Sequence, residues 1–274
     1  MVTCAIWALP AFGASRVPNP FFAYELGEGV PEQQARLASD VGFDGMAFDD
    51  AKLVPERLKA LESVQGQLFF LWISLDIGKE RLTYDANLEK SIRALSGHGT
   101  VIWLALEGKG PNAEKAAVEA SRHVADLAAE SNLRVALYPH YGFYLSTLKD
   151  VMRVAEEAHR SNLGVTFNLC HELRSGMQSD LYPSLERVLP RLYGVTINGA
   201  YREAKNWDGL IQPLDKGDYD VADLLRELVA MGYRGPIGLQ CWGIKENPRE
   251  HLARSMKTWK RISAEISARQ ITNR

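Results

Sequence analysis

Residues 165–171 read VTFNLCH, and this stretch carries the pattern that decides the fold. A short apolar run, Val165–Phe167, ends in the polar residue Asn168, and His171 follows three residues later. Unbroken apolar runs are typical of parallel strands that are covered on both faces. The same arrangement, an apolar run that ends in a polar side chain and precedes a helical stretch, occurs eight times along the chain of 274 residues.

The repeated pattern predicts eight strands separated by helices. The predicted strands are Phe21–Glu25, Gly45–Asp49, Leu68–Leu75, Val101–Leu106, Arg134–Tyr138, Val165–Asn168, Gly194–Asn198 and Pro236–Gln240. Strict alternation of strands and helices predicts an α/β fold, a single closed (β/α)8 barrel of the TIM type, with a doubly wound open sheet as the alternative.

Helices are expected between these strands, because apolar residues there recur at helical spacing. Three such stripes are Ala116–Ala120–Val124, Leu148–Val151–Met152–Ala155 and Val221–Leu224–Leu225–Leu228, and a closing helix is predicted over Arg249–Ala268. Pro31, Pro55 and Pro248 stand where helices would begin, a position that tolerates the missing N–H of proline. We expect one domain over residues 19–270, preceded by an arm or the remnant of a leader over residues 1–18.

The composition is that of a globular protein, with 46% hydrophobic and 24% charged residues. A net charge of −2 gives no reason to expect nucleic acid or an anionic membrane as a partner. Three cysteines without a CxxC pair favour a reduced, cytoplasmic setting, although the apolar stretch Met1–Ser15 leaves a trimmed secretory leader open. No segment approaches the roughly 20 apolar residues that cross a bilayer.

Every predicted strand ends in a polar side chain, and in a barrel these ends gather at one rim. The residues at the strand ends are Glu25, Asp49 with Asp50, Asp76, Glu107, Tyr138 with His140, Asn168 with His171, Asn198 and Gln240. Asn, Gln, His and Tyr suit hydrogen bonds to a polyhydroxylated ligand. Trp72, Trp207 and Trp242 lie near the same ends and offer apolar faces for a sugar ring. The expected partner is therefore a small carbohydrate, and a homo-oligomer stays open.

Three stretches resemble the sugar phosphate isomerase and epimerase family with the xylose isomerase-like barrel. They are Val135–His140 (VALYPH), Val165–His171 (VTFNLCH) and Val195–Ala200 (VTINGA), and Gln212–Asp220 and Gly232–Gln240 agree in order. The resemblance implies that Tyr138, Asn168, Thr196 and Gln240 occupy the positions of the family's metal ligands. It also implies that His171 and Arg202 keep the positions of substrate-contacting residues.

In the family, carboxylates and a histidine hold a divalent cation that stabilises an enediolate-like transition state. The four residues at those positions here are uncharged at neutral pH, whereas cation sites in proteins usually include carboxylates. We therefore expect no metal cofactor. Mn, Mg, Co or Zn is not excluded, and a relocated site that uses Glu107, Asp49 or Asp76 stays open.

The resulting hypothesis is a sugar isomerase or epimerase, or a related lyase, that works by proton transfer. His140, His171 and Tyr138 are the predicted catalytic residues, because histidine titrates near neutral pH and a hydroxyl can stabilise an oxyanion. The predicted substrate-binding residues are Asn168, Asn198, Arg202, Gln240, Glu107 and Trp242.

The alternative hypothesis is a non-catalytic carbohydrate-binding or regulatory barrel that has lost metal-dependent activity. The remaining histidines, which are His98, His123, His159 and His251, are predicted to lie on the surface. Cys170 and Cys241 are expected to be small buried side chains rather than nucleophiles.

Overall fold

Eight parallel strands form a closed barrel in the computed structural model, which describes residues 17–27, 29–49, 51–79, 82, 84, 87–176 and 178–272. The strands are β1 (Phe21–Tyr24), β2 (Gly45–Phe48), β3 (Gln67–Asp76), β4 (Val101–Glu107), β5 (Arg134–Leu137), β6 (Leu163–Asn168), β7 (Leu192–Ile197) and β8 (Ile237–Gln240). All eight predicted strands are confirmed to within two residues at each end. The predicted arm over residues 1–18 falls almost wholly outside the described residues, as does Asp50.

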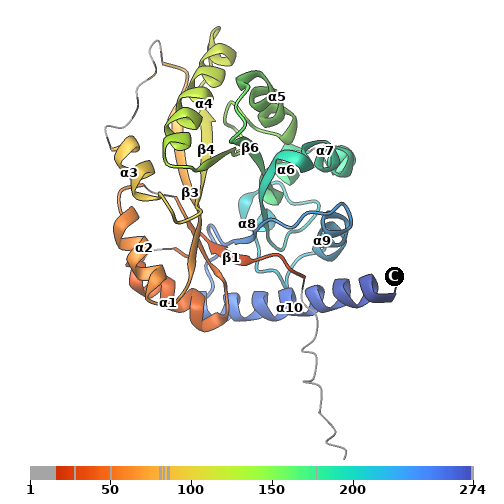
Figure 1. Ribbon diagram of the computed structural model, residues 1–274. Coiled ribbons are helices and arrows are strands. Elements are labelled where there is room, and N and C mark those ends of the chain that lie inside the picture. The colour runs from red at the N-terminus through yellow and green to blue at the C-terminus, as the bar shows by residue number, and fades with distance from the viewer. Residues whose placement is uncertain are drawn as a thin grey trace, which may run out of the picture.

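Helices follow the strands and surround the barrel, as Figure 1 shows. The longer helices are α1 (Pro31–Val41), α2 (Val54–Glu62), α4 (Ala113–Glu130), α5 (Leu148–Ala158), α7 (Leu181–Val188), α9 (Val221–Ala230) and α10 (Pro248–Thr272). The short ones are α3 (Leu88–Ala94), α6 (Leu169–Ser175), α8 (Trp207–Leu210) and the 3-10 turns Gln178–Asp180 and Leu189–Arg191. Helices begin at or next to Pro31, Pro55 and Pro248, as predicted.

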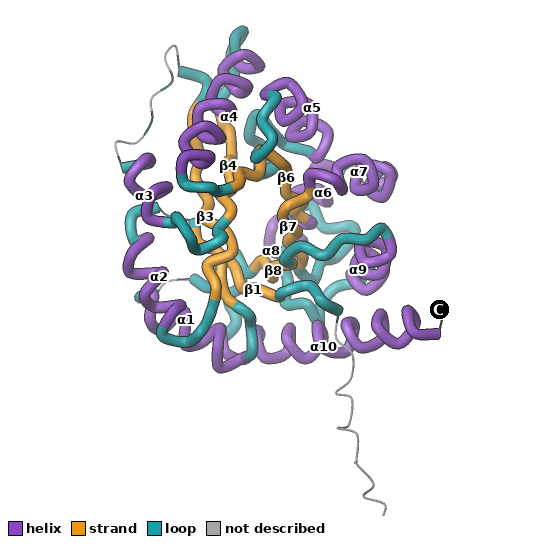
Figure 2. The backbone as a smooth tube through the Cα atoms, in the orientation of Figure 1, coloured by secondary structure: helices purple, strands orange, loops and turns teal. Residues whose placement is uncertain are grey.

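Closure of the barrel rules out the open-sheet alternative. Each strand pairs with the next one, and β8 pairs in parallel with β1, with Phe22 opposite Gly238 and Tyr24 opposite Gln240. The long helix α10 packs on this closing pair from outside, where Trp259 stacks on Phe21 with ring centroids 4.1 Å apart. Figure 2 shows α10 passing beside β1 and β8. No helix in the described part of the chain has the length and apolarity that a bilayer crossing requires.

Aromatic rings fill the barrel interior, and glycines on the facing strands leave space for them. Trp103 on β4 stacks on Phe70 of β3 at 4.2 Å between ring centroids, and Phe22 of β1 lies 5.3 Å from Phe70. Gly238 and Gly194 leave room for these rings, since a Cβ at either position would come 2.2 Å from Phe22 or 2.5 Å from Phe70. Close packing of this kind excludes a channel through the barrel.

This packing predicts that Gly238→Ala destabilises the fold, because the added methyl group would overlap the Phe22 ring. Overpacking of this kind costs about 1–3 kcal/mol. Urea denaturation followed by circular dichroism measures the change. Gly110→Ala is the matched control, since a Cβ there meets no atom within 4 Å. Equal stability of the two variants would contradict the proposed packing.

Candidate functional site

A cavity of about 280 Å³ lies at the carboxyl ends of the strands, where barrel enzymes hold their chemistry. Its polar lining consists of Tyr24, Glu25, Asp49, Tyr138, His140, His171 and Gln240. Trp72, Trp207 and Trp242 line the same space, and the rings of Trp207 and Trp242 meet edge to face at 6.3 Å. Five predicted site residues, Tyr138, His140, His171, Gln240 and Trp242, are thus brought together here.

Tyr138 sits at the floor of this cavity within a cluster of uncharged groups. Asn168 donates its amide N–H to the Tyr138 hydroxyl, and Gln240 also hydrogen-bonds that hydroxyl. The oxygen of each amide accepts a hydrogen bond from another group. Asn168 Oδ1 accepts from the Cys170 thiol at 3.0 Å, and Gln240 Oε1 accepts from the backbone N–H of Trp242 at 3.1 Å. Both amides therefore present N–H groups to Tyr138. Its own O–H is left to donate into the cavity.

The two predicted catalytic histidines lie side by side, with ring centroids 4.1 Å apart. Both are tied to the main chain of Tyr141. The Nδ1 atom of His140 lies 3.1 Å from the Tyr141 carbonyl oxygen, and Tyr141 N–H donates to the Nδ1 atom of His171 at 3.3 Å. A carbonyl oxygen only accepts and a backbone N–H only donates, so these contacts assign the ring protons. His140 carries its proton on Nδ1, and His171, when neutral, carries it on Nε2.

Burial keeps both imidazoles uncharged. It lowers the pKa of His140 below 6.5, and burial together with the neighbouring His140 lowers the pKa of His171 well below that value. Both rings are therefore neutral at pH 7. His140 then presents an unprotonated Nε2, a hydrogen-bond acceptor, and the neighbouring His171 presents an Nε2–H, a hydrogen-bond donor.

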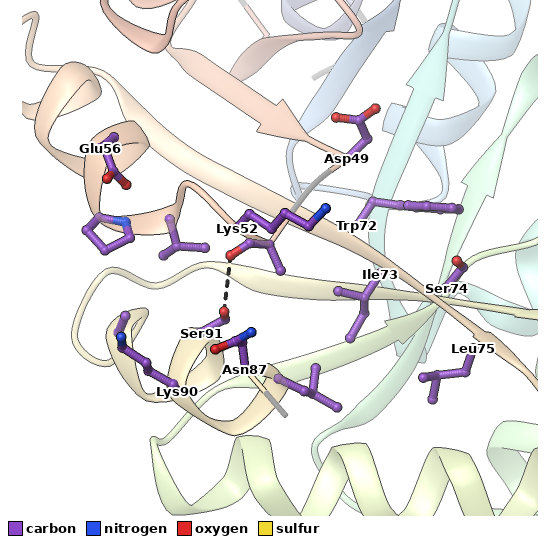
Figure 3. A pocket seen from close by; sticks show the side chains of 15 residues that line it. Asp49, Lys52, Glu56, Trp72, Ile73, Ser74, Leu75, Asn87, Lys90 and Ser91 are labelled. Atoms are coloured by element: carbon purple, nitrogen blue, oxygen red, sulfur yellow. Dashed lines mark hydrogen bonds between the residues drawn. The ribbon is translucent and has the colours of Figure 1, made fainter. Parts of the chain in front are cut away.

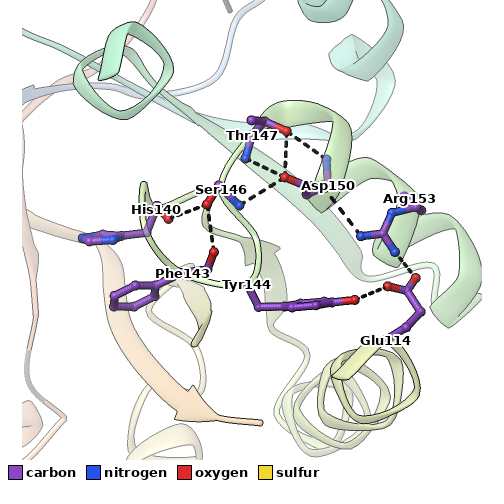
Figure 4. A network of polar contacts seen from close by, with 8 residues as sticks. All are labelled: Glu114, His140, Phe143, Tyr144, Ser146, Thr147, Asp150 and Arg153. Carbon is purple, nitrogen blue, oxygen red and sulfur yellow. Dashed lines mark hydrogen bonds and ion pairs between the residues drawn. The ribbon is translucent and has the colours of Figure 1, made fainter. Parts of the chain in front are cut away.

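The loop between β5 and α5 that carries His140 is held by a network of its own, drawn in Figure 4. Ser146 Oγ donates to the Phe143 carbonyl at 2.8 Å, and Thr147 and Asp150 cap α5 reciprocally. Tyr144 donates to Glu114 of α4 at 2.5 Å, and Glu114 also pairs with Arg153 of α5. Two outer helices thus fix the loop. The position of His140 depends on these contacts as well as on β5.

Glu25 and Asp49, at the ends of β1 and β2, add a carboxyl pair to the cavity. Their side chains are hydrogen-bonded, and burial together with the charge of Asp49 raises the pKa of Glu25 to about 7. Glu25 also has a φ of 61°, a left-handed conformation that a non-glycine residue seldom adopts and that often marks functional sites. The sequence placed both residues at the rim, but their mutual contact and the partial burial of Glu25 depend on the folded structure.

Four predicted substrate-binding residues do not line the cavity. Asn168 is fully buried beneath it against Tyr138, and the other three are Asn198, Arg202 and Glu107. The Asn198 amide donates to the carbonyls of Gly199 at 2.8 Å and Leu210 at 2.6 Å, and thereby shapes the loop after β7. Arg202 is exposed, and its backbone N–H and Nε donate to Asp218. Glu107 ends β4 opposite Asp76 and does not reach the cavity. In this structure Asn198 and Arg202 therefore organise loops.

Two predictions about other side chains have different outcomes. Cys170 and Cys241 are buried, and burial raises the pKa of both thiols, as expected for inert side chains. The surface prediction for His251 is wrong, because its side chain is only 2% exposed. It lies one and two helical turns before the buried Ser255 and Trp259 on the inner face of α10. Because buried serines occupy part of that face, the pattern of hydrophobic residues in the sequence does not identify the face as buried.

The four residues that the resemblance places at metal-ligand positions have no donor set of the kind that cations usually bind. Asn168 and Gln240 both hydrogen-bond the Tyr138 hydroxyl, and Thr196 is buried with its Oγ1 unpartnered among the described residues. None is a carboxylate, and both amide oxygens already accept hydrogen bonds. The described residues contain no group of three or more His, Cys, Asp or Glu side chains arranged to hold a metal.

A larger cavity of about 520 Å³ adjoins the site between β3, α2 and α3, and shares Asp49 and Trp72 with it (Figure 3). Figure 3 shows these two residues on one side, with Asn87 and Lys90 on the other. Among the described residues its lining contains no histidine and no tyrosine, and its titratable groups are Asp49, Lys52, Glu56 and Lys90. The three predicted catalytic residues all line the smaller, central cavity instead.

Glu172, next to His171, gives a pH-dependent prediction. It is 3% exposed, and burial raises its pKa from 4.5 to about 7. The folded protein therefore binds the proton of the Glu172 carboxyl more tightly than the unfolded chain does. The contribution of this proton to the free energy of unfolding is complete below pH 4.5 and is lost as pH rises through about 7. Through this group the wild type should lose up to about 3 kcal/mol of unfolding free energy between pH 4.5 and pH 8, and Glu172→Gln should not show that loss.

Urea denaturation of the wild type and the variant at pH 4.5 and pH 8 measures this difference. Glu186→Gln, on the exposed face of α7, is the matched control and should change stability equally at both values. If Glu172→Gln retains the full pH dependence of the wild type, the assignment to Glu172 is wrong.

Comparison with known proteins gives one family and several structural neighbours. The family model described as xylose isomerase-like TIM barrel matches residues 74–262. A 3-keto-D-glucoside 4-epimerase from E. coli is 17% identical, with a TM-score of 0.71 over 89% of this chain and 99% of its own. A D-allulose 3-epimerase from Methylomonas sp. is 16% identical, with a TM-score of 0.70 over 90% of this chain and 98% of its own.

A probable 3-DHS dehydratase from Bacillus anthracis is 16% identical, with a TM-score of 0.69 over 87% of this chain and 98% of its own. At such identities the likeness concerns the fold alone. A comparison with curated proteins finds no sequence that matches. The family match spans well over half of the residues, and with the closed barrel it leads to one conclusion: the chain belongs to the xylose isomerase-like TIM barrel family.

Proposed function

We propose that this protein isomerises or epimerises a sugar or keto-sugar by proton transfer through its paired histidines. The proposal depends on the main-chain contacts that hold His140 and His171, which both line the cavity, in opposite tautomers. The neighbours named as acting on 3-keto-D-glucoside and D-allulose support a carbohydrate substrate. Three tryptophans supply apolar faces against which a sugar ring can pack.

In the proposed reaction, His140 Nε2 takes the proton from the carbon next to the substrate carbonyl. Electron density then moves onto the carbonyl oxygen. The Tyr138 O–H and His171 Nε2–H donate hydrogen bonds to that oxygen and stabilise the developing charge. Burial raises the pKa of Tyr138 well above its usual value, so the hydroxyl keeps its proton at neutral pH. Protonation of the same carbon on its opposite face, for which the Glu25 carboxyl in the same cavity is available, inverts that carbon and completes an epimerisation. Return of the proton from His140 to the neighbouring, former carbonyl carbon, with transfer of the hydroxyl proton of the deprotonated carbon to the former carbonyl oxygen, completes an isomerisation.

We further propose that this chemistry proceeds without a divalent metal at the Tyr138–Asn168–Gln240 cluster. The support is the donor chemistry described above, since no carboxylate stands at any of the family's ligand positions. The same neutral cluster also favours the second candidate, a carbohydrate-binding barrel without catalysis. The two candidates differ in whether a bound sugar exchanges its proton with solvent.

Exchange of substrate protons with D2O tests the proton transfer directly. Incubation of the protein with D-allulose, L-ribulose and methyl 3-keto-β-D-glucoside should put deuterium next to the carbonyl of at least one, as NMR would detect. His140→Ala and His171→Ala should each slow this exchange about 100-fold or more, which is the usual contribution of a general acid or base.

His123→Ala, in an exposed position on α4, is the matched control and should exchange at the wild-type rate. Undiminished exchange in His140→Ala would contradict the proposed base. Binding of a sugar by calorimetry, with no exchange over long incubation, would favour the non-catalytic candidate.

Metal content gives an independent prediction. Because the donor set lacks carboxylates, dialysis against EDTA should leave the exchange rate within about twofold of its starting value. Elemental analysis of the purified protein should find no stoichiometric Mn, Mg, Co or Zn. A one-to-one metal content that is lost together with activity would overturn the metal-free part of the proposal.

A further inference from the structure

A second cavity, of about 610 Å³, adjoins the central one on the side of β1, β2 and the start of α10. The two cavities share Glu25, Asp49 and Trp242 as their common wall. Trp242 is 49% exposed and lines both cavities. A ligand that lies against this indole is therefore in reach of both cavities.

The size of the central cavity limits what it can hold. Ligand pockets usually have volumes of roughly 300–1,000 Å³, and the central cavity, at about 280 Å³, lies just below that range. It has room for one sugar ring. A larger ligand has to continue into an adjoining space, and the second cavity begins at the carboxyl pair.

His251 gives a reason to expect an occupant in that second cavity. Its side chain lines the cavity, is 2% exposed, and has an Nδ1 atom without a hydrogen-bond partner among the described residues. A buried polar atom without a partner is unfavourable, so a ligand hydroxyl group that reaches this nitrogen would stabilise the bound state.

The charges around the second cavity favour an uncharged occupant. Arg57 lies close enough to Glu25 to lower the pKa of that carboxyl, and its guanidinium stacks on Phe48 at 4.3 Å. Lys245 lies 3.6 Å from Asp208. Each cation of this cavity thus has an anionic neighbour already. A neutral sugar unit fits that balance better than a phosphate group.

We propose that the substrate consists of two linked sugar units, with the reacting ring beside His140 and His171 and the second ring in the cavity lined by His251 and Trp242. The oxygen that links the rings then lies at the Glu25–Asp49 pair, which forms the common wall of the two cavities. This inference rests on the proposed function for the identity of the reacting ring. It adds the substrate class, a glycoside in place of a free monosaccharide.

Calorimetric titration with matched probes tests the second cavity without any need for turnover. The monosaccharide probes are D-glucose, D-galactose and D-allulose, and the two-unit probes are maltose, cellobiose, lactose and sucrose. At least one two-unit probe should bind about tenfold more tightly than its component monosaccharides, which equals about 1.4 kcal/mol. Ile244→Trp, which fills the second cavity, should abolish that gain and leave monosaccharide affinity within about twofold.

His251→Leu should reduce the gain several-fold through loss of the unpartnered nitrogen. Tyr201→Trp is the control, because it also introduces a tryptophan, at an exposed position that lines neither cavity. Gln34→Trp, which also lies in the wall of the second cavity, replaces Ile244→Trp if circular dichroism shows that variant to be unfolded.

The outcomes separate this inference from the proposed function. If monosaccharides bind and no two-unit probe binds more tightly, the inference is wrong and the proposed function stands. If D-glucose 6-phosphate gains affinity over D-glucose and the disaccharides do not, the second cavity is an anion site and the inference is wrong. If no sugar of either size binds, both the inference and the proposed function are contradicted.

Discussion

The stacked rings at the centre of the barrel are the contact on which both the fold and the candidate site depend. Trp103 is fully buried against Phe70, and its ring lies edge to face with Tyr24 and Tyr138 at 5.1 Å from each. Those two tyrosines line the cavity. The floor of the site is therefore the upper layer of the hydrophobic core, and the core holds the tyrosine hydroxyls in place. A site built in this way needs little reorganisation when a ligand enters.

Above this floor, the polar groups divide into two halves with different chemistry. The carboxyl pair Glu25–Asp49 comes from β1 and β2, whereas His140 and His171 follow β5 and β6 on the opposite part of the barrel. Burial acts on both halves in the direction of neutrality, because it raises the pKa of Glu25 and lowers the pKa of both histidines. A lining of neutral histidines, tyrosines, an amide and carboxyl groups offers hydrogen bonds to a ligand that presents hydroxyl groups on every side.

Much of the fold was predictable from the sequence, and the reason is local. Each strand is a continuous apolar run that ends in a polar residue, so both its existence and its carboxyl end are visible without tertiary information. The rim itself follows from closure of the barrel, which brings Tyr138, His140, His171 and Gln240 to one cavity. Asn198 was misleading, because its amide turns back to the carbonyls of its own loop. Loop paths of that kind are not encoded in the spacing of residues.

Other features required the three-dimensional structure. The contact between Glu25 and Asp49 joins two loops whose course the sequence pattern does not specify, and the left-handed backbone of Glu25 has no signature such as glycine. His251 was hidden for a different reason, since serines share its buried helical face. Patterns of hydrophobicity identify a buried face only where that face is apolar.

Main-chain atoms of Tyr141 determine which ring nitrogen of each histidine carries the proton, and this affects which substitutions position 141 tolerates during evolution. Any amino acid with a backbone N–H would hold His171 in the same form, and every amino acid supplies the carbonyl that holds His140. The Tyr141 ring, which contacts Trp207 and Arg174, has no part in setting the two ring forms. Only a proline, which lacks the N–H, would release one ring of the pair.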